Sequence, residues 1–181
     1  MTVAEKYCMQ CGTALTEKFL ASEGKHIPFC PSCNEYRFPV FSTAVSMIVT
    51  NKEHNRILLI KQYGGDSYIL TAGYVNKGED AEDAVIREVK EETGLIVTDL
   101  SFNHSHYFSR SNTLMLNFTV TVADEILHPN EEIDSYAWFS YEEARANIRR
   151  NSLAQAFLNG YLDQHWVFRE NLAKPYPHTD Q

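Results

Sequence analysis

The stretch that most constrains this chain runs from Gly73 to Leu95 and reads GYVNKGEDAEDAVIREVKEETGL. Its charged residues and glycines follow the spacing Gly-x5-Glu-x7-Arg-Glu-U-x-Glu-Glu-x-Gly-U, where U is an aliphatic residue. Residues 80–93 are expected to form a helix, because acidic side chains fill its first turn and Gly94 supplies a C-terminal stop. The stretch therefore predicts a glycine-containing loop that leads into one acidic helix.

Three glutamates of this helix, Glu88, Glu91 and Glu92, are expected on one face, because residues three and four positions apart are neighbours on a helix. Lys90 points elsewhere. An apolar stripe lies directly beside the glutamate face and is formed by Val85, Ile86 and Val89. The three carboxylates are therefore expected at the rim of a core and not in free solvent.

The glutamate face is unfavourable on its own, because like charges at these spacings destabilise a helix by about 0.2–0.5 kcal/mol per pair. Divalent cations would neutralise it. Hard oxygen ligands and an open coordination sphere suit Mg²⁺ or Mn²⁺, which also bind phosphate groups. The alternative interpretation is a solvated acidic helix, but the flanking glycines and the Glu79 and Arg87 positions favour the metal site.

The whole stretch resembles the Nudix box, without a mismatch. This resemblance implies an α/β Nudix fold, a mixed β-sheet sandwiched between helices, over residues 38–172. It also implies hydrolysis of a nucleoside diphosphate linked to another group. In such proteins water attacks phosphorus, and metal ions on the box glutamates offset the charge of the pyrophosphate oxygens.

The resemblance also implies roles for individual residues. Glu88 and Glu92 would be the principal Mg²⁺ or Mn²⁺ ligands, with Glu91 helping, and Glu79 would pair with Arg87 to hold the loop against the helix. The identity of the general base stays open among the glutamates. A further metal ligand would come from the backbone carbonyl that precedes the box glycine, that of Ala72.

All the cysteines lie near the N-terminus, as the pairs Cys8-x2-Cys11 and Cys30-x2-Cys33. This spacing is typical of a four-thiolate zinc site. Two disulfides are the alternative, but nothing in the sequence indicates secretion, and cytosolic thiols stay reduced. Four ligands would complete the tetrahedron, so we expect a structural zinc ion in a zinc ribbon over residues 1–37.

Composition excludes several functional classes. The chain has 181 residues, of which 44% are hydrophobic, and no apolar run approaches the roughly 20 residues of a membrane span. The first ten residues are polar and lack a signal-peptide core, which favours the cytoplasm. A formal charge of −8 argues against DNA binding, which depends on neutralising phosphates. It permits a nucleotide substrate held through metal ions.

The remaining pattern predicts a strand-rich domain with helices at its C-terminal end. Strands are expected at residues 40–50, 56–62, 68–72, 96–109, 113–123 and 136–139. Helices are expected at residues 141–150 and 152–172, with Ser152 as the N-cap of the second. Residues 173–181 contain two prolines and are expected to form a flexible tail.

With the cysteine pairs in front of the box, residues 8–162 are similar to the zinc-containing NADH pyrophosphatases, the family of NAD-capped RNA hydrolases. The resemblance implies that Tyr74 stacks on a base, that Glu132 is a further metal ligand and that the backbone of Ala154 contacts substrate. Three alternatives stay open: a half-buried loop aromatic at Tyr74, Glu131 in place of Glu132, and ordinary helix packing at Ala154.

One segment departs from this family. Where the family has Ser-Gln-Pro-Trp-Pro-Phe-Pro-x-Ser, residues 105–113 read SHYFSRSNT. Phe108 replaces the tryptophan and all three prolines are absent, so the loop is expected to be less rigid. Arg110 brings a cation that suits an extra phosphate or carboxylate. Phe108 and Arg110 are therefore candidate substrate contacts.

Three functional hypotheses follow. The first is a hydrolase that cleaves NADH or NAD-type dinucleotides, or the NAD cap of an RNA, to mononucleotides. The second is a Nudix hydrolase of ADP-ribose, FAD, a nucleotide sugar or a nucleoside triphosphate. The third is a non-catalytic nucleotide sensor, against which the complete set of repelling glutamates argues. A homodimer is an expectation from the family resemblance, and no membrane partner is expected.

Overall fold

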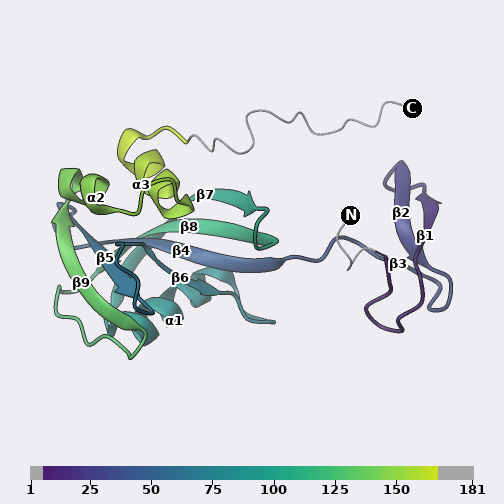
Figure 1. The fold of residues 1–181 in the computed structure, drawn as a ribbon, viewed down its shortest axis with the longest axis horizontal. Coiled ribbons are helices and arrows are strands. Elements are labelled where there is room, and N and C mark those ends of the chain that lie inside the picture. The colour runs from purple at the N-terminus through teal and green to yellow at the C-terminus, as the bar shows by residue number, and fades with distance from the viewer. Residues whose placement is uncertain (1–5, 167–181) are drawn as a thin grey trace. The chain divides into compact units, whose positions relative to one another are not determined.

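The computed structural model describes residues 6–166, and the chain divides into two compact units, Met1–Phe41 and Ser42–Gln181 (Figure 1). The division lies a few residues after the predicted boundary between residues 37 and 38. The predicted flexible tail, residues 173–181, lies outside the described residues.

The first unit is a small antiparallel sheet in the order β1-β2-β3. Its strands are β1 (Thr16–Leu20), β2 (Lys25–Cys30) and β3 (Glu35–Tyr36). Few of its apolar side chains are buried, chiefly Ile27 and Phe29 beside two cysteines. So small an apolar core contributes little stability, and domains of this size commonly depend on a metal or disulfides.

The second unit contains a mixed six-stranded sheet in the order β7-β8-β4-β5-β9, with β6 also paired to β4. Strands β4 and β8 are parallel and the other pairs are antiparallel. The strands are β4 (Ser42–Thr50), β5 (Arg56–Gln62), β6 (Thr71–Tyr74), β7 (Val97–Phe108), β8 (Thr113–Val122) and β9 (Ile133–Ser140). The central strand β4 is buried along most of its length, because both faces of the sheet are covered.

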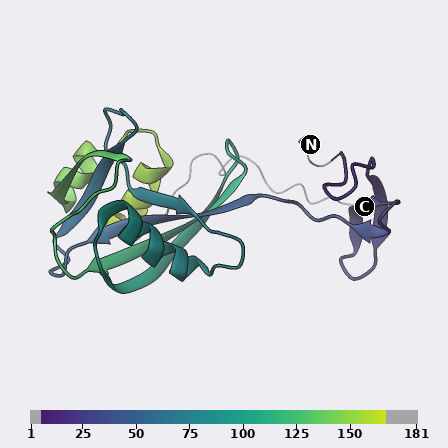
Figure 2. The same cartoon turned by 90° about the horizontal axis from the view of Figure 1, so that it is seen from below.

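Helices cover the two faces of this sheet. Helix α1 (Ala81–Thr93) lies on one face, and α2 (Tyr141–Asn147) and α3 (Leu153–Asp163) lie on the other (Figures 1 and 2). Alternate residues of β4 divide between two cores: Val45 and Met47 pack in the cluster that contains α1 residues, whereas Ile48 packs in the cluster that contains α3 residues. The predicted α/β sandwich with a mixed sheet is confirmed.

Several predicted boundaries were wrong. Helix α2 ends at Asn147, not at residue 150, because Ile148 is extended. Helix α3 begins after its predicted N-cap Ser152 but ends at Asp163, because Gln164 has a left-handed φ of 51°; residues 167–172 of the predicted helix lie outside the described part. Strand β6 begins and ends later than residues 68–72, β9 is longer than residues 136–139, and β4 starts at Ser42.

The predicted apolar stripe of α1 needs one correction. Val85 and Val89 are fully buried, but Ile86 is 45% exposed, and the stripe is completed by Ala84.

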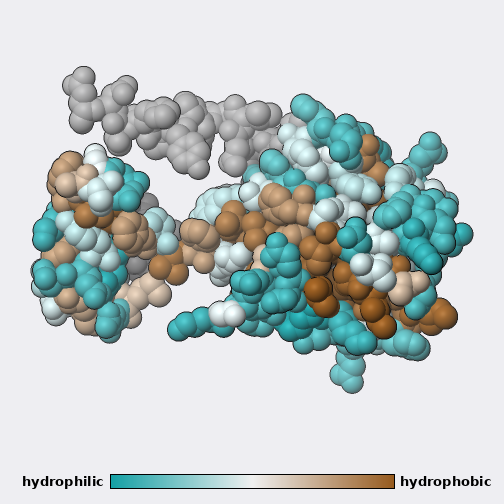
Figure 3. Space-filling view, turned by 180° about the vertical axis from the view of Figure 1, so that it is seen from behind, coloured by the Kyte–Doolittle hydropathy of each residue, from teal (hydrophilic) through white to brown (hydrophobic). Residues whose placement is uncertain are grey.

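Apolar side chains also gather on the surface of this unit, drawn brown in Figure 3. Among residues 6–166, no helix combines the length and the apolar character that crossing a membrane requires.

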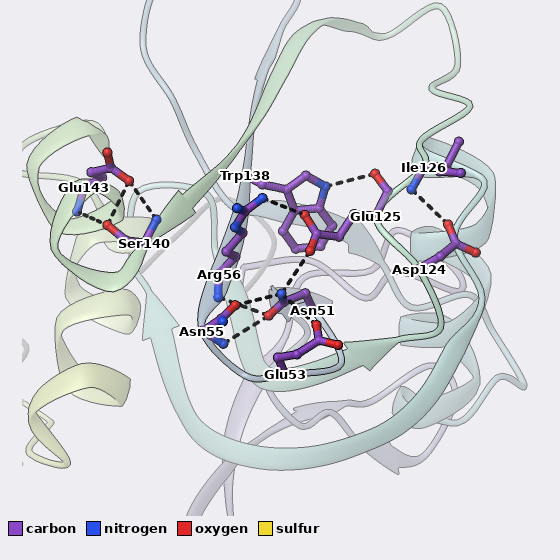
Figure 4. Close-up of polar contacts among 10 residues, drawn as sticks. All are labelled: Asn51, Glu53, Asn55, Arg56, Asp124, Glu125, Ile126, Trp138, Ser140 and Glu143. Atoms are coloured by element: carbon purple, nitrogen blue, oxygen red, sulfur yellow. Dashed lines mark hydrogen bonds and ion pairs between the residues drawn. The ribbon is translucent and has the colours of Figure 1, made fainter.

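Asn51 fixes the turn between β4 and β5 and ties it to the chain that follows β8 (Figure 4). Its side chain is buried, and its amide nitrogen donates to Glu53, Asn55 and Glu125 over 2.8–3.1 Å. Its amide oxygen accepts from the backbone N–H groups of Asn55 and Arg56. One side chain therefore satisfies two backbone donors of the turn and orients a distant carboxylate.

Replacing this side chain should destabilise the second unit without a direct effect on chemistry. The substitution Asn51→Ala leaves two backbone N–H groups without their acceptor and removes a donor from one oxygen of Glu125. We therefore expect a loss of about 2–3 kcal/mol in the free energy of unfolding. Chemical denaturation measures the loss. The control Lys52→Ala, at an exposed neighbour, should stay within about 0.5 kcal/mol of wild type. Equal stability of the two variants would contradict this role of Asn51.

Candidate active site and zinc centre

The carboxylate of Glu88 packs directly against the backbone of Gly73. A Cβ atom at position 73 would lie 1.9 Å from Cδ of Glu88, and both carboxylate oxygens would lie within 2.4 Å. Gly73 pairs with Val45 in the sheet, so β6 brings this bare backbone beneath α1. A side chain at position 73 would therefore displace the Glu88 carboxylate from the backbone of β6.

Arg87 forms hydrogen bonds with three of the glutamates near α1. Its guanidinium binds Glu79 through two hydrogen bonds of 2.6 and 2.9 Å, and it also donates to Glu88 at 2.7 Å and to Glu91 at 3.1 Å. A fifth bond, 3.0 Å long, reaches the backbone carbonyl of Tyr74 at the end of β6. The predicted contact between Glu79 and Arg87 is thus present, and the same guanidinium orients two of the box glutamates.

Glu92 is the buried member of the cluster. The residue is only 4% exposed, and its Oε2 atom has no hydrogen-bond partner among the described residues. Burial, followed by the negative charges of Glu88 and Glu132, raises the pKa of Glu92 to about 8, although a hydrogen bond from Gln62 opposes the shift. A buried carboxylate with an unpaired oxygen among other carboxylates is a position where a cation would be stabilised.

The loop between β8 and β9 brings Glu132 to the same place. The backbone N–H groups of His128 and Asn130 donate to the carbonyls of Thr93 and Glu92, at the end of α1. The Asn130 side chain in turn accepts from the backbone N–H of Glu132. Of the two adjacent candidates, Glu132 is the one whose charge contributes to the raised pKa of Glu92. We therefore favour Glu132 over Glu131 as the further ligand.

The candidate substrate contacts lie outside this network, on separate elements. Tyr74 ends β6 and is 60% exposed, and Phe108 ends β7 and is half-buried. Arg110 is exposed in the turn between β7 and β8, and Ala154 lies in the first turn of α3, packed against the second core. Tyr74 is the one tied to the glutamates, because its carbonyl accepts from Arg87.

Two residues near the cluster were missed by the sequence analysis. Gln62, the last residue of β5, lowers the pKa of the buried Glu92, and the backbone N–H of the next residue, Tyr63, donates to the Glu132 carbonyl at 3.4 Å. Neither belongs to a recognisable motif. A tyrosine directly before two glycines, where a turn favours asparagine or glycine, was the one signal available.

The chemistry of the donor set fits a divalent cation. Carboxylate oxygens from Glu88, Glu91 and Glu92 on one helix and from Glu132 on a loop are hard ligands of the kind that Mg²⁺ and Mn²⁺ select. The unpaired oxygen of Glu92 is the observation that supports the fit. Ala72, the predicted backbone ligand, lies on β6 beside Gly73 and opposite Ser46 of β4.

The four cysteines of the first unit form a second candidate metal centre. Cys8, Cys11, Cys30 and Cys33 form no disulfide, and their sulfur atoms all lie within 4.8 Å of one another. Three of the sulfur pairs are 3.4–3.9 Å apart, close to the roughly 3.8 Å between ligands of a tetrahedral zinc with 2.3 Å bonds. The cluster could therefore hold zinc.

The electrostatics of Cys8 also favour a thiolate. Burial alone would raise the pKa of the Cys8 thiol, but hydrogen bonds from the Arg37 guanidinium and from the backbone of Cys11 and Gln10 lower it to about 6. The Nε atom of Arg37 lies 3.2 Å from the Cys8 sulfur. A cation that donates to a metal-binding sulfur is a typical outer partner of a thiolate site.

The second unit thus combines a glutamate-rich helix, packed against a glycine, with a mixed sheet that has helices on both faces. The NUDIX domain model matches residues 40–158, and the chain therefore belongs to the Nudix family. A crystal structure of a NUDIX hydrolase from Nitrosomonas europaea superposes with a TM-score of 0.62, covering 90% of this chain and 96% of that one. At 18% identity, this likeness shows the fold alone.

Among curated proteins, the chain is similar to the NAD-capped RNA hydrolase NudC of two bacteria. It is 28% identical to the protein of Pseudomonas aeruginosa LESB58 and 29% identical to that of Stutzerimonas stutzeri A1501, in each case over 158 residues or 87% of this chain. These matches cover 55% and 56% of the relatives, so the chain spans about half of their length.

The ion pair between Glu79 and Arg87 should appear in the acid stability of the protein. Hydrogen bonds from Arg87 and from the backbone of Asn76 lower the pKa of Glu79 from 4.5 to about 2. A lowered pKa stabilises the fold above the unfolded-state value, and this stabilisation is lost as the pH falls through about 2.

The variant Glu79→Gln should therefore flatten the decline in stability of the wild type between about pH 4.5 and pH 2, and it should be less stable at pH 7. Denaturation at a series of pH values measures this. Glu82→Gln, at an exposed position in the first turn of α1, is the matched control and should follow the wild-type curve. Parallel wild-type and Glu79→Gln curves would show that the pair does not carry this linkage.

Proposed function

We propose that this protein hydrolyses the pyrophosphate bond of a nucleoside diphosphate-linked substrate, and that NADH or NAD-type dinucleotides are cleaved to mononucleotides. The observation that carries the proposal is the buried Glu92, whose Oε2 atom has no hydrogen-bond partner among the described residues and which lies on the same helix as Glu88 and Glu91. The similarity to NAD-capped RNA hydrolases supports the dinucleotide substrate, and it extends the proposal to the NAD cap of an RNA.

The chain's own residues supply position and charge. Arg87 fixes the carboxylates of Glu88 and Glu91, while Gly73 lets Glu88 approach β6. A bound Mg²⁺ or Mn²⁺ would offset the charge of the pyrophosphate oxygens and lower the pKa of a water. Tyr74 offers an exposed ring for a base, next to the carbonyl held by Arg87.

The hairpin between β7 and β8 supports a second candidate substrate class. Its tip lacks the prolines of the family motif and carries the exposed Arg110, while the Tyr107 hydroxyl bonds to Asn112 across the turn. A cation at this place favours a leaving group with an extra phosphate or carboxylate. ADP-ribose, FAD, nucleotide sugars and nucleoside triphosphates are therefore the alternatives to NADH.

The test is a hydrolysis panel with Mg²⁺ or Mn²⁺ over NADH, NAD⁺, NAD-capped RNA, ADP-ribose, FAD, dinucleoside polyphosphates, nucleotide sugars and nucleoside triphosphates. We expect NADH to have the highest kcat/KM. Glu92→Gln should lower kcat by about 100-fold or more. The substitution removes a carboxylate ligand of the proposed metal ion, whose positive charge would stabilise the transition state. The exposed Glu82→Gln is the control and should retain wild-type activity.

The other outcomes separate the hypotheses. A higher kcat/KM for one of the alternative substrates would retain the pyrophosphatase chemistry and reject the dinucleotide assignment. If nothing is hydrolysed with either cation while a nucleotide still binds, the hypothesis of a non-catalytic sensor replaces that of a hydrolase.

The cytoplasmic location and the homodimer stay predictions. Sedimentation of the purified protein tests whether it is a homodimer.

The cysteine cluster is proposed to hold one structural zinc ion. We expect elemental analysis of protein purified under reducing conditions to give one zinc per chain. All four thiols should react with a thiol reagent only after a chelator removes the metal. Cys30→Ser, which changes a fully buried ligand, should lose the zinc. Unreactive cysteines without bound zinc would instead identify two disulfides.

A further inference from the structure

We propose that Arg37 is a positioning residue of the cysteine cluster, which holds the Cys8 thiolate and the turn around it in the geometry that a zinc ion requires. The inference rests on the proposed structural zinc, and it names the residue that helps to retain the ion. Three features of the first unit support it: the hydrogen bonds of Arg37, the burial of its side chain and the charge of the cluster.

The cysteines reach the cluster as two pairs on different segments. Cys8 and Cys11 lie in a tight turn before β1, which the Cys8 N–H closes by donating to the Thr13 carbonyl at 2.8 Å. Cys30 ends β2, and Cys33 lies in the turn that leads to β3. Three contacts of 3.4–3.9 Å join sulfur atoms of one pair to those of the other. Thiolates this close repel one another, so the turn of the first pair needs a further attachment to the second segment.

Arg37, directly after β3, supplies this attachment. Its Nε atom donates to the Cys8 sulfur at 3.2 Å, and its Nη2 atom donates to the Gln10 side chain at 3.1 Å. The backbone N–H of Arg37 donates to the Pro28 carbonyl in β2 at 2.7 Å. One residue therefore joins the turn that carries the first cysteine pair to the strand that carries Cys30.

The burial of Arg37 favours Cys8 over Glu35 as the partner that balances its charge. Nη1 of Arg37 lies 2.7 Å from Glu35, but the Glu35 side chain is 60% exposed, against 21% for Arg37. An ion pair with so exposed a partner contributes little, whereas a largely buried cation needs a negative charge close by. Cys8 is only 2% exposed and accepts from the same guanidinium. A thiolate at Cys8 would satisfy that need.

The charge of the cluster explains why the donor is an arginine. Four thiolates carry more negative charge than one Zn²⁺ ion neutralises, and a cationic donor to one sulfur offsets part of the excess. A backbone donor, such as the Cys33 N–H that reaches the Cys30 sulfur at 3.4 Å, brings no net charge. Arg37 makes its side-chain contacts from separate nitrogens, an arrangement that the single ammonium of lysine does not reproduce.

The experiment measures the zinc affinity of the full chain under reducing conditions, by competition with a chromophoric chelator. Arg37→Met removes the donors and keeps an apolar side chain. It should weaken zinc binding by about 10- to 100-fold, as is typical of residues that orient metal ligands. Arg37→Lys should recover only part of this loss, because it restores the charge but not the planar fork.

The spectrum of the cobalt-substituted protein separates positioning from a general loss of stability. In Arg37→Met the thiolate-to-cobalt charge-transfer band should move to longer wavelength, because a thiolate without its cationic donor gives up electron density more easily. Lys18→Met is the matched control, because it removes the same charge from the same unit, where Lys18 lies 4.0 Å from the centre of the Phe29 ring. It should keep the wild-type band and a zinc affinity within twofold of wild type.

The outcomes distinguish this role from the zinc centre itself. If the wild type binds one zinc and Arg37→Met binds it within twofold as tightly, the zinc centre stands and the positioning role is rejected. Weaker binding with an unmoved band would also overturn the proposal, because Arg37 would then support only the fold of the first unit. A wild type that binds no zinc would reject the zinc centre and the positioning role together.

Discussion

The second unit depends on a concentration of negative charge that its own residues only partly neutralise. Arg87 forms hydrogen bonds with Glu79, Glu88 and Glu91. Glu92 is buried, and among residues 6–166 no ion pair joins it to a cationic side chain. A buried, unpaired carboxylate is unfavourable unless it is protonated or bound to a cation. The arrangement is therefore stable in one of two ways, with a proton on Glu92 or with a metal ion, and the proposed hydrolysis requires the second.

The backbone around the cluster is built to tolerate this charge. Gly73 removes the side chain that would collide with Glu88, and the loop through Asn130 is fastened to the last carbonyls of α1. These features come from three separate segments that the sheet brings together. Each feature acts locally. Together they fix the place of the Glu88 carboxylate and join the loop before Glu132 to α1, as a rigid scaffold commonly does for a functional site.

The segment from Gly73 to Leu95 was predictable because all the residues of its motif are close together in the sequence. The spacing from Gly73 to Leu95 defined α1, its Gly94 stop and the contact of Arg87 with Glu79. Helix ends were less predictable: α3 stops at Asp163 because Gln164 turns left-handed, although the apolar pattern continues. Glu132 came from a family resemblance, and its approach to Glu92 depends on backbone bonds that no local pattern encodes.

The turn after β5 could not be predicted for a different reason. Its strain is visible only in the positive φ angle of Tyr63, and the bulge that aligns β5 with β9 leaves no local pattern in the sequence. A sequence shows that tyrosine is a poor residue for such a turn, but not that the turn is present. Local preference and global fold therefore disagree at this position, because the pairing of β5 with β9 outweighs the preference of one residue.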